Sequence, residues 1–256
     1  MRASTRVDNL AVSRLMGGPG GVYRLVKLPC AYCGGLGVET DHVIARQFFP
    51  NAPAYRWNLP QVPACRRCNG AKQRVEDGPG VIFQFGNTSE GSHQLLLTRI
   101  RRTLDKNQRL HRSLRHSLRN VLVRRPSGVL VPTLALMLSP RDLRDIWAWF
   151  PYVARGLYYF ERQSVLPADH TIHLVSPPTQ EHFAMLLNLI ASGSTRQARQ
   201  YASGEIRYVY TCNDTEQLTL WLLAFKSIDM FWFTVGPLSA TVVPSMLAGI
   251  EWKDPG

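Results

Sequence analysis

The sequence is poor in acidic residues. Its 256 residues include 18 Asp or Glu against 30 Lys or Arg, which gives a formal net charge of +12. The deficit is greatest between Arg99 and Arg125, where ten cationic side chains accompany a single acid, Asp105, for a local charge of +9. The rest of the chain carries only +3, so most of the positive charge belongs to one segment that would attract polyanions.

The same segment has the pattern of an amphipathic helix or helix pair. Nonpolar residues and one histidine recur mainly at steps of three and four, at Leu97, Ile100, Leu104, His111, Leu114, Leu118 and Val121. A cationic outer face suits a surface that neutralises phosphates without reading base sequence. The alternatives are an ordinary solvated face, which usually mixes acids with bases, and an anionic membrane surface. We predict nucleic-acid contacts from Arg101, Arg102, Arg109, Arg112, Arg115 and Arg119.

Several common functional motifs are missing. The chain has no internal repeat, no separate hydrolase triad and no glycine loop that would hold a nucleotide phosphate. The glycine-rich run at residues 17–21 has neither the preceding strand nor the following helix of a dinucleotide-binding turn. These absences argue against repeat proteins and against enzymes that depend on those motifs.

Residues 1–21 also lack the apolar core of a signal peptide. We therefore expect a cytoplasmic protein, with residues 1–27 as a mobile N-terminal arm. Residues 230–250 carry no charge, and a run of this length raises the question of a membrane span. Gly236, Pro237 and Pro244 interrupt it, so buried strands and turns are predicted there, without stable membrane association.

Cysteine is scarce, but four of the five cysteines form two Cys-x-x-Cys pairs, Cys30/Cys33 and Cys65/Cys68. Two residues between paired cysteines let both thiolates reach one ion from a tight turn, and two pairs complete the tetrahedral site of structural zinc. Two disulfides are the alternative, but they do not persist in a reducing compartment. We predict a structural Zn²⁺, and we expect the fifth cysteine, Cys212, to be a small buried hydrophobe.

The 31 residues between the pairs contain groups suited to phosphodiester hydrolysis. Residues 34–44 predict a turn and a short strand that carries Asp41 and His42, whose side chains point to opposite faces. A neutral imidazole can accept a proton from water, and a carboxylate is a hard ligand of the kind that Mg²⁺ or Mn²⁺ prefers. Taken alone, an Asp-His pair is more often a surface turn or a core histidine.

Two asparagines extend this group. Asn58 lies in a loop before a second short strand, where it either bonds a backbone group of the loop or orients the His42 imidazole; an ordinary Asx-turn is the alternative. The segment after Cys68 has helical character and would carry the Asn69 carboxamide back towards Asp41. A strand, a second strand and a helix would then surround one ion.

Together these residues resemble the HNH endonucleases, in the version with four zinc-binding cysteines. The resemblance covers about residues 28–78 and includes Asp-His-Val-Ile at 41–44 and Val-Pro-Ala-Cys-Arg-Arg-Cys-Asn at 62–69. It implies a ββα-metal nuclease core with His42 as general base, Asn58 as support for the loop and the base, and Asp41 and Asn69 as ligands of a catalytic Mg²⁺ or Mn²⁺. Arg46 and Lys72 would bind phosphate, although each could be an ordinary solvated cation.

The sequence departs from the family pattern in three places. Asn69 stands where the family has its last histidine, Ala45-Arg46 replaces a proline and a lysine or serine, and no glycine pair precedes Asn58. Asparagine in the last position favours a hard cation without excluding activity. The other two changes remove no ligand that the resemblance implies.

After residue 125 the sequence predicts an α+β domain with a mostly antiparallel sheet. A helix begins at Ser139-Pro140 and continues to Phe160, with an aromatic face that we assign to the core. The phrase at 153–159 resembles one in the C-terminal regions of uncharacterised bacterial HNH proteins. A second helix is predicted over 179–190, and strands are predicted over 170–175, 206–211, 218–225 and 230–235.

The predicted fold class is therefore α+β, in four parts. These are an N-terminal arm (1–27), a zinc-stapled HNH nuclease domain (28–90), a basic helical segment (91–125) and a C-terminal α+β domain (126–256). The resemblance implies a metal-dependent endonuclease that leaves 5′-phosphate and 3′-hydroxyl ends, with DNA favoured over RNA, in phage defence or mobile-element biology. The C-terminal domain would provide targeting, sensing or a homodimer interface. The alternative function is a zinc-ribbon protein that binds nucleic acid without cutting it.

Overall fold

The computed structural model describes residues 27–253, except for 86, 88, 126, 177–178, 194, 213–217, 227 and 238–250. The predicted N-terminal arm lies almost entirely outside the described residues, as does most of the uncharged run after 237. Within the described part the chain is α+β, and all paired strands are antiparallel. The predicted fold class is confirmed at this level.

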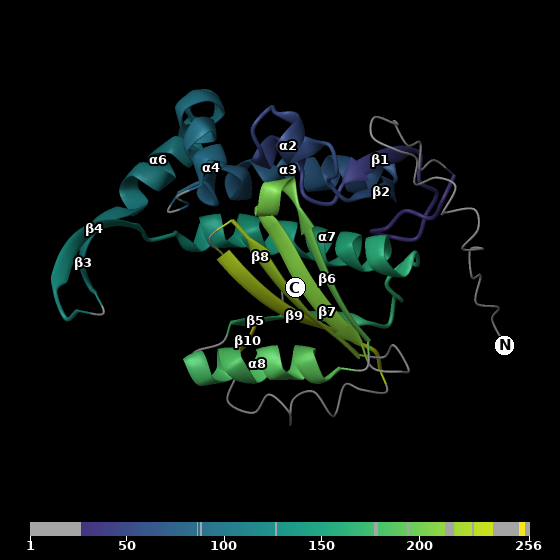
Figure 1. Cartoon of the computed structure of the whole chain (residues 1–256). Helices are drawn as coiled ribbons and strands as arrows, with labels where there is room; N and C mark the ends of the chain where they lie inside the picture. Colours follow the sequence, from purple (N-terminus) through teal and green to yellow (C-terminus); the bar gives the residue numbers. More distant parts are fainter. Residues whose placement is uncertain are drawn as a thin grey trace.

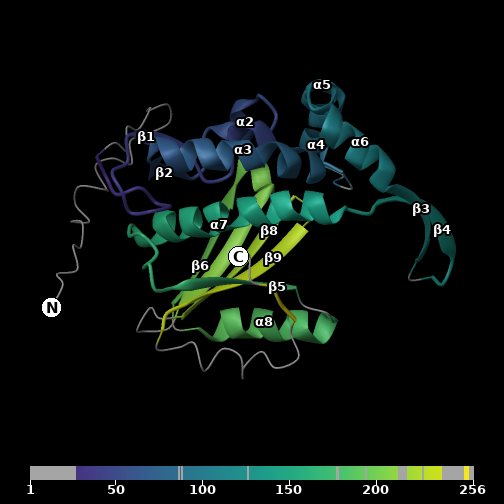
Figure 2. The ribbon, with the colours of Figure 1, turned by 180° about the vertical axis from the view of Figure 1, so that it is seen from behind.

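The molecule is built in layers around one long helix, α7 (Pro140–Arg162), as Figures 1 and 2 show. Residues from the cysteine segment to the basic segment form the layer on one side of α7, and a six-stranded sheet lies on its other side. A final helix, α8 (Gln180–Ser192), covers the far face of the sheet. The helix α7 therefore has protein on both sides, which explains why Trp149, Phe150 and Val153 are completely buried.

The strand, strand and helix expected around the second cysteine pair are present. Strands β1 (Glu39–His42) and β2 (Gln61–Ala64) pair with His42 opposite Gln61, and α3 (Arg66–Ile82) follows directly. The rest of this layer comprises η1 (Arg46–Phe48), α2 (Pro53–Arg56), α4 (Glu90–Leu95), the π-helical turn η2 (Leu96–Ile100), α5 (Arg101–Lys106) and α6 (Gln108–Ser117).

The basic segment differs from the prediction at its end. The helices stop at Ser117, and the chain continues as β3 (Leu118–Arg124), which pairs with β4 (Leu130–Leu136) as a separate two-stranded sheet. The helical prediction for 118–125 was therefore wrong. Leu118 and Val121 satisfied the helical spacing, but the β-branched residues on both sides of a turn at Gly128, where φ is 83°, favour a hairpin.

The six-stranded sheet confirms the predicted strands and adds two others. Its order is β10-β5-β9-β8-β7-β6. No local pattern indicated β6, which is a polar edge strand (Thr-Arg-Gln-Ala-Arg-Gln-Tyr), or β10, which has only three residues. The strands are β5 (Thr171–Ser176), β6 (Thr195–Tyr201), β7 (Ile206–Cys212), β8 (Leu218–Phe225), β9 (Ile228–Val235) and β10 (Glu251–Lys253); the short helix η3 (Ala202–Gly204) joins β6 to β7.

One hydrophobic core extends from the cysteine segment through α7 to the sheet. At its centre the ring centroid of Trp149 lies 5.5 Å from the ring centroids of both Phe48 and Phe83. The ring centroid of Phe225 on β8 lies 5.5 Å from that of Phe83. A smaller cluster lies between α8 and the opposite face of the sheet. The large core fixes β1, β2 and α3 against α7, and this sets the geometry of the polar residues that follow.

Candidate functional site

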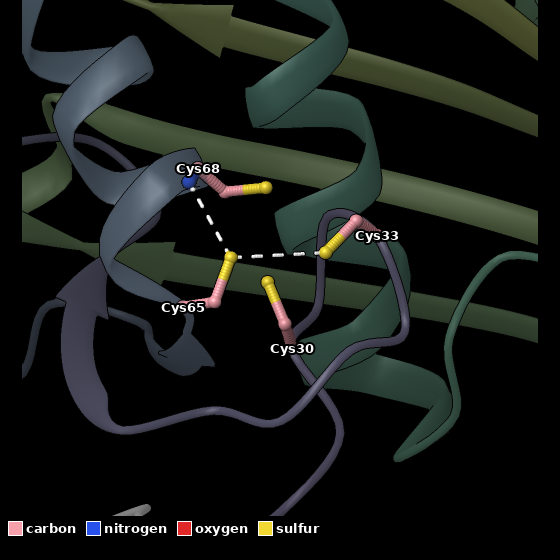
Figure 3. A group of neighbouring side chains, drawn as sticks. All are labelled: Cys30, Cys33, Cys65 and Cys68. Carbon is pink, nitrogen blue, oxygen red and sulfur yellow. Dashed lines mark hydrogen bonds between the residues drawn. The ribbon is translucent and has the colours of Figure 1, made fainter.

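The four paired cysteines form one cluster. Cys30 and Cys33 come from the loop before β1, Cys65 is the N-cap of α3 and Cys68 lies in its first turn (Figure 3). All four Sγ atoms lie within 4.8 Å of one another, and those of Cys33 and Cys65 are 3.8 Å apart. Four Zn–S bonds of about 2.3 Å at tetrahedral angles require sulfur atoms separated by about 3.8 Å. The cluster therefore fits a metal ion such as zinc, and 3.8 Å is too long for a disulfide.

The thiols of the cluster differ in the direction of their pKa shifts. The Cys68 backbone N–H donates to the Sγ of Cys65 at 3.4 Å, and this lowers the pKa of the Cys65 thiol to about 7. Burial raises the pKa of Cys30 and of Cys68. A metal ion would offset that burial because coordinated thiols are deprotonated.

Tyr32 connects the first cysteine pair to Asp41. It lies between Cys30 and Cys33, and its hydroxyl donates a hydrogen bond of 2.5 Å to Oδ2 of Asp41. Burial, and then the charge of Asp41, raise the pKa of Tyr32 well above its usual value. The backbone oxygen of Tyr32 accepts from Nη1 of Arg155 on α7 at 3.0 Å. The cysteine cluster and α7 together therefore position a hydroxyl that holds Asp41.

Lys72 lies at the centre of the contact between β1 and α3. Its side chain is only 1% exposed, and Nζ lies 3.0 Å from Oδ2 of Asp41 and 2.7 Å from Oε1 of Glu76. Nζ also donates to the backbone oxygen of His42 at 2.7 Å. A buried ammonium with these partners does not reach a phosphate, so the expectation that Lys72 contacts nucleic acid was wrong. Lys72 is buried because Glu76 lies one helical turn after it on α3 and because β1 packs over its side chain.

Asn69 lies at the same contact between β1 and α3, one turn before Lys72. Its Nδ2 donates to Oε2 of Glu39 at 2.7 Å, and its Oδ1 accepts from Nε2 of Gln73 at 3.3 Å. Glu39 and Asp41 are two residues apart on β1, so both carboxylates face α3. Side-chain oxygens of Glu39, Asp41 and Asn69 therefore lie at this contact, and each of the three side chains has a protein partner. The sequence analysis did not identify Glu39 as a member of this group. Its position two residues before Asp41 on a predicted strand could have indicated that both side chains share a face.

Within the described ranges, the four cysteines are the one set of three or more His, Cys, Asp or Glu side chains whose ligand atoms are close enough to share an ion. The oxygen group around Asp41 is not such a set. Its members are held by protein partners.

His42 is half-buried and neutral at pH 7. Burial lowers its pKa to about 4; the charges of Arg46, Lys72 and Arg56 act in the same direction, and Asp41 opposes them. Its Nε2 lies 3.2 Å from Nε2 of Gln61, the residue opposite it on β2. An amide nitrogen can only donate, so this contact leaves the ring proton on Nδ1.

Asn58 does not take the position next to His42 that was considered for it. Its Oδ1 accepts from the backbone N–H of Ala202 in η3 at 3.4 Å. Asn58 therefore ties the loop before β2 to the C-terminal sheet, and Gln61 is the amide beside the imidazole. The contact spans 144 residues of sequence, so no local pattern could have indicated it.

Two arginines, Arg46 and Arg56, lie near His42, and a third, Arg99, lies near Arg56. Arg46 is exposed, as expected for a phosphate contact, while Nη2 of Arg56 donates to the backbone oxygen of Phe49 at 2.6 Å. Arg99, the first cation of the basic segment, donates to Oε1 of Gln47 at 2.9 Å. Burial, and then the charges of Arg46 and Arg99, lower the pKa of Arg56. The sequence analysis did not predict that Arg56 and Arg99 belong to this group of arginines.

The other predicted nucleic-acid contacts are exposed. Arg109 also has a partner, because its Nη2 lies 3.8 Å from Oδ2 of Asp145 on α7. Arg119 lies on β3 and not on a helix. The exposed set is Arg101, Arg102, Arg109, Arg112, Arg115 and Arg119.

Comparisons with family models, with curated proteins and with solved structures found no match to this chain. A search of the described helices found none that combines the length and the apolar character needed to cross a membrane.

Proposed function

We propose that this protein is a metal-dependent HNH endonuclease that hydrolyses phosphodiester bonds of nucleic acid, with DNA the favoured substrate. One observation carries the proposal. A neutral imidazole, His42, and a carboxylate, Asp41, occupy neighbouring positions on β1, next to a helix that starts in a four-cysteine cluster. A structural zinc ion in that cluster would hold both cysteine pairs, and with them Tyr32 and the start of α3.

His42 is the general base in this proposal. Its pKa of about 4 keeps the ring neutral near pH 7, so it can accept a proton from the attacking water. The contact with Gln61 directs the Nε2 lone pair to one side of the hairpin. A water that replaces the Gln61 amide would meet that lone pair.

Asp41 and Asn69 would hold a Mg²⁺ or Mn²⁺ ion, and Glu39 adds a third hard oxygen donor nearby. The ion supplies positive charge for the leaving 3′-oxygen. Tyr32 keeps Asp41 in place, and Arg46 binds the phosphate backbone beside His42.

A zinc-ribbon protein that binds nucleic acid without cutting it is the second candidate. The observation that favours it is the ion pair between Lys72 and Asp41, whose Nζ and Oδ2 atoms are 3.0 Å apart. Asn69 is likewise engaged by Glu39. Both proposed ion ligands therefore already have protein partners.

Plasmid nicking with added Mg²⁺ or Mn²⁺ distinguishes the two. We expect the wild type to convert supercoiled DNA to the nicked form, and His42→Ala to lower the rate by about 10²–10⁴-fold. His93→Ala, which removes an exposed imidazole from α4, is the matched control and should nick at the wild-type rate.

Equal rates for the wild type and His42→Ala would refute the catalytic role. The absence of cleavage of DNA and RNA with either metal, together with retained binding, would favour the second candidate.

A further inference from the structure

Strands β3 and β4 form a ribbon that projects from the body of the molecule at the end of α6 (Figures 1 and 2). None of the residues 118–124 or 130–136 is buried. An isolated two-stranded hairpin is at best marginally stable in water, and exposed apolar strands invite association. The ribbon therefore has the properties of a surface that a partner covers.

The two faces of the ribbon are distinct. The register places Leu118 opposite Leu136, Asn120 opposite Leu134, and Arg124 opposite Leu130, so these residues share one face. Leucines of this face are conspicuously accessible, with exposed fractions of 66% for Leu122, 61% for Leu134 and 56% for Leu130. The other face carries Arg119 and the β-branched residues Val121, Val123, Val131 and Thr133.

The charge of the ribbon and of α6 decides what kind of partner fits. No acidic residue occurs between Lys106 and Arg141, while that stretch contains eight Lys or Arg residues. A second copy of the chain would bring like charges together and is disfavoured. An anionic partner with apolar surface between its charges matches both the arginines and the leucines.

We propose that the ribbon lies in a groove of duplex DNA, with its leucine face on the base edges and Arg124 of that face on a phosphate. The B-form major groove is about 12 Å wide and admits a two-stranded β-ribbon, and thymine methyl groups offer apolar contacts. The major groove of A-form RNA is deep and narrow, so side chains cannot read it. The ribbon therefore selects duplex DNA over duplex RNA, which names the substrate class and rests on the proposed function.

A cationic path joins the ribbon to the candidate site. It begins at Arg46 and Arg56 near His42, passes Arg99 near Arg56, and continues over α5 and α6. The hairpin β1–β2 and the ribbon lie at opposite ends of this layer, with α3 between them (Figure 1). The 17 residues of α3 span about 25 Å, or about seven base pairs. The ribbon thus holds DNA some distance from the bond that is cut.

Fluorescence anisotropy with the full-length protein tests the proposal. The probes are a DNA duplex of about 30 base pairs and an RNA duplex of the same sequence, without added divalent metal. We expect the DNA duplex to bind more tightly than the RNA duplex. Arg124→Ala should weaken DNA binding by about threefold or more at 0.1 M salt and reduce the slope of log K against log salt by about 0.9. Arg144→Ala removes one exposed arginine from α7 and is the charge-matched control.

A second variant tests the apolar face. Leu122→Ser/Leu134→Ser keeps every charge and alters only exposed side chains, so the fold should be retained. We expect it to lower the preference for the DNA duplex over the RNA duplex and to leave the salt slope unchanged.

The inference is overturned if the wild type binds both duplexes equally, or if both ribbon variants bind DNA as the wild type does. It is also overturned if a dimer is lost in sedimentation when Leu122 and Leu134 are replaced. Binding of vesicles with anionic lipid that depends on the ribbon, without an effect on DNA, would also overturn it. Nicking by the same samples separates the two proposals: expected binding without Mg²⁺-dependent nicking removes only the nuclease, and nicking with ribbon-independent binding removes only the ribbon.

Discussion

At the level of single residues, Lys72 carries a charge that the interior tolerates because two carboxylates surround it. Burial raises the pKa of Glu76, and the ammonium of Lys72 opposes this rise. Asp41 has only 11% of its side chain exposed, so the same ammonium also balances its charge. A lysine three residues after an asparagine has no sequence feature that distinguishes this buried role from a surface contact.

Replacing Lys72 separates these two roles. We expect Lys72→Met to lower the free energy of unfolding by about 3–5 kcal/mol, because it leaves Asp41 and Glu76 as neighbouring unpaired carboxylates. Urea denaturation measures the loss. Arg74→Met on the same helix, where the side chain is exposed, should change stability little. A Lys72→Met protein as stable as the wild type would contradict the buried ion-pair role.

At the level of elements, α7 connects the candidate site to the sheet. The phrase at 153–159 that stood out in the sequence lies on this helix, and two of its residues contact the nuclease-like segment. Arg155 donates to the backbone of Tyr32, and Gly156 lies against Val43, the residue after His42. A Cβ atom on Gly156 would lie 2.8 Å from Cγ1 of Val43. The glycine is therefore required for the close approach of the helix to the end of β1.

This contact predicts an unusual effect of alanine in a helix. Gly→Ala inside a helix ordinarily stabilises by up to about 1 kcal/mol, and we expect this for Gly70→Ala on α3, where the nearest atom is 3.9 Å away and belongs to a flexible arginine. Gly156→Ala should instead destabilise by about 1–3 kcal/mol because it overpacks the core. Thermal or urea unfolding checks both.

The double variant Gly156→Ala/Val43→Ala tests the cause. If the clash with Val43 is responsible, removing the valine side chain should make Gly156→Ala cost less in the double variant than alone. Independent, additive effects would contradict this explanation.

At the level of the whole molecule, the shared core links metal binding to the stability of the sheet. Cys30 and Cys68 belong to the same apolar cluster as Trp221 and Trp232, which stack with their ring centroids 5.4 Å apart. Loss of the metal from the cysteine cluster should therefore also destabilise the six-stranded sheet. Separate cores would allow the two parts to unfold independently.

Metal removal tests that link. We expect one zinc ion per chain, and we expect Cys65→Ser to lose it and to lower the free energy of unfolding by more than about 3 kcal/mol. Zinc release and tryptophan fluorescence should change at the same denaturant concentration. Cys212→Ser, which alters a buried cysteine outside the cluster, should keep its zinc. Two separate transitions would contradict the shared core.

Local patterns predicted much of this fold. The spacing of the cysteines is a local constraint, so it predicted the cluster, and Ser139 with Asp142 forms the capping box that starts α7 where the sequence indicated. Alternating apolar residues predicted the central strands. The hairpin β3–β4 was missed because Leu118 and Val121, three residues apart, continue the helical spacing of the preceding segment. Strand β6 was missed because its polar sequence lacks apolar alternation.

The sequence by itself determined which chemical groups this protein possesses: four thiols at metal-binding spacing, an Asp-His pair, and an acid-free cationic stretch. Only the tertiary structure decided their partners. In the folded protein Lys72 is buried between two carboxylates and His42 contacts Gln61. Asn58 accepts a hydrogen bond from Ala202, and the ribbon is exposed. These contacts join segments up to 144 residues apart. They depend on how whole layers pack around α7, and layer packing leaves no trace in the local pattern of residues.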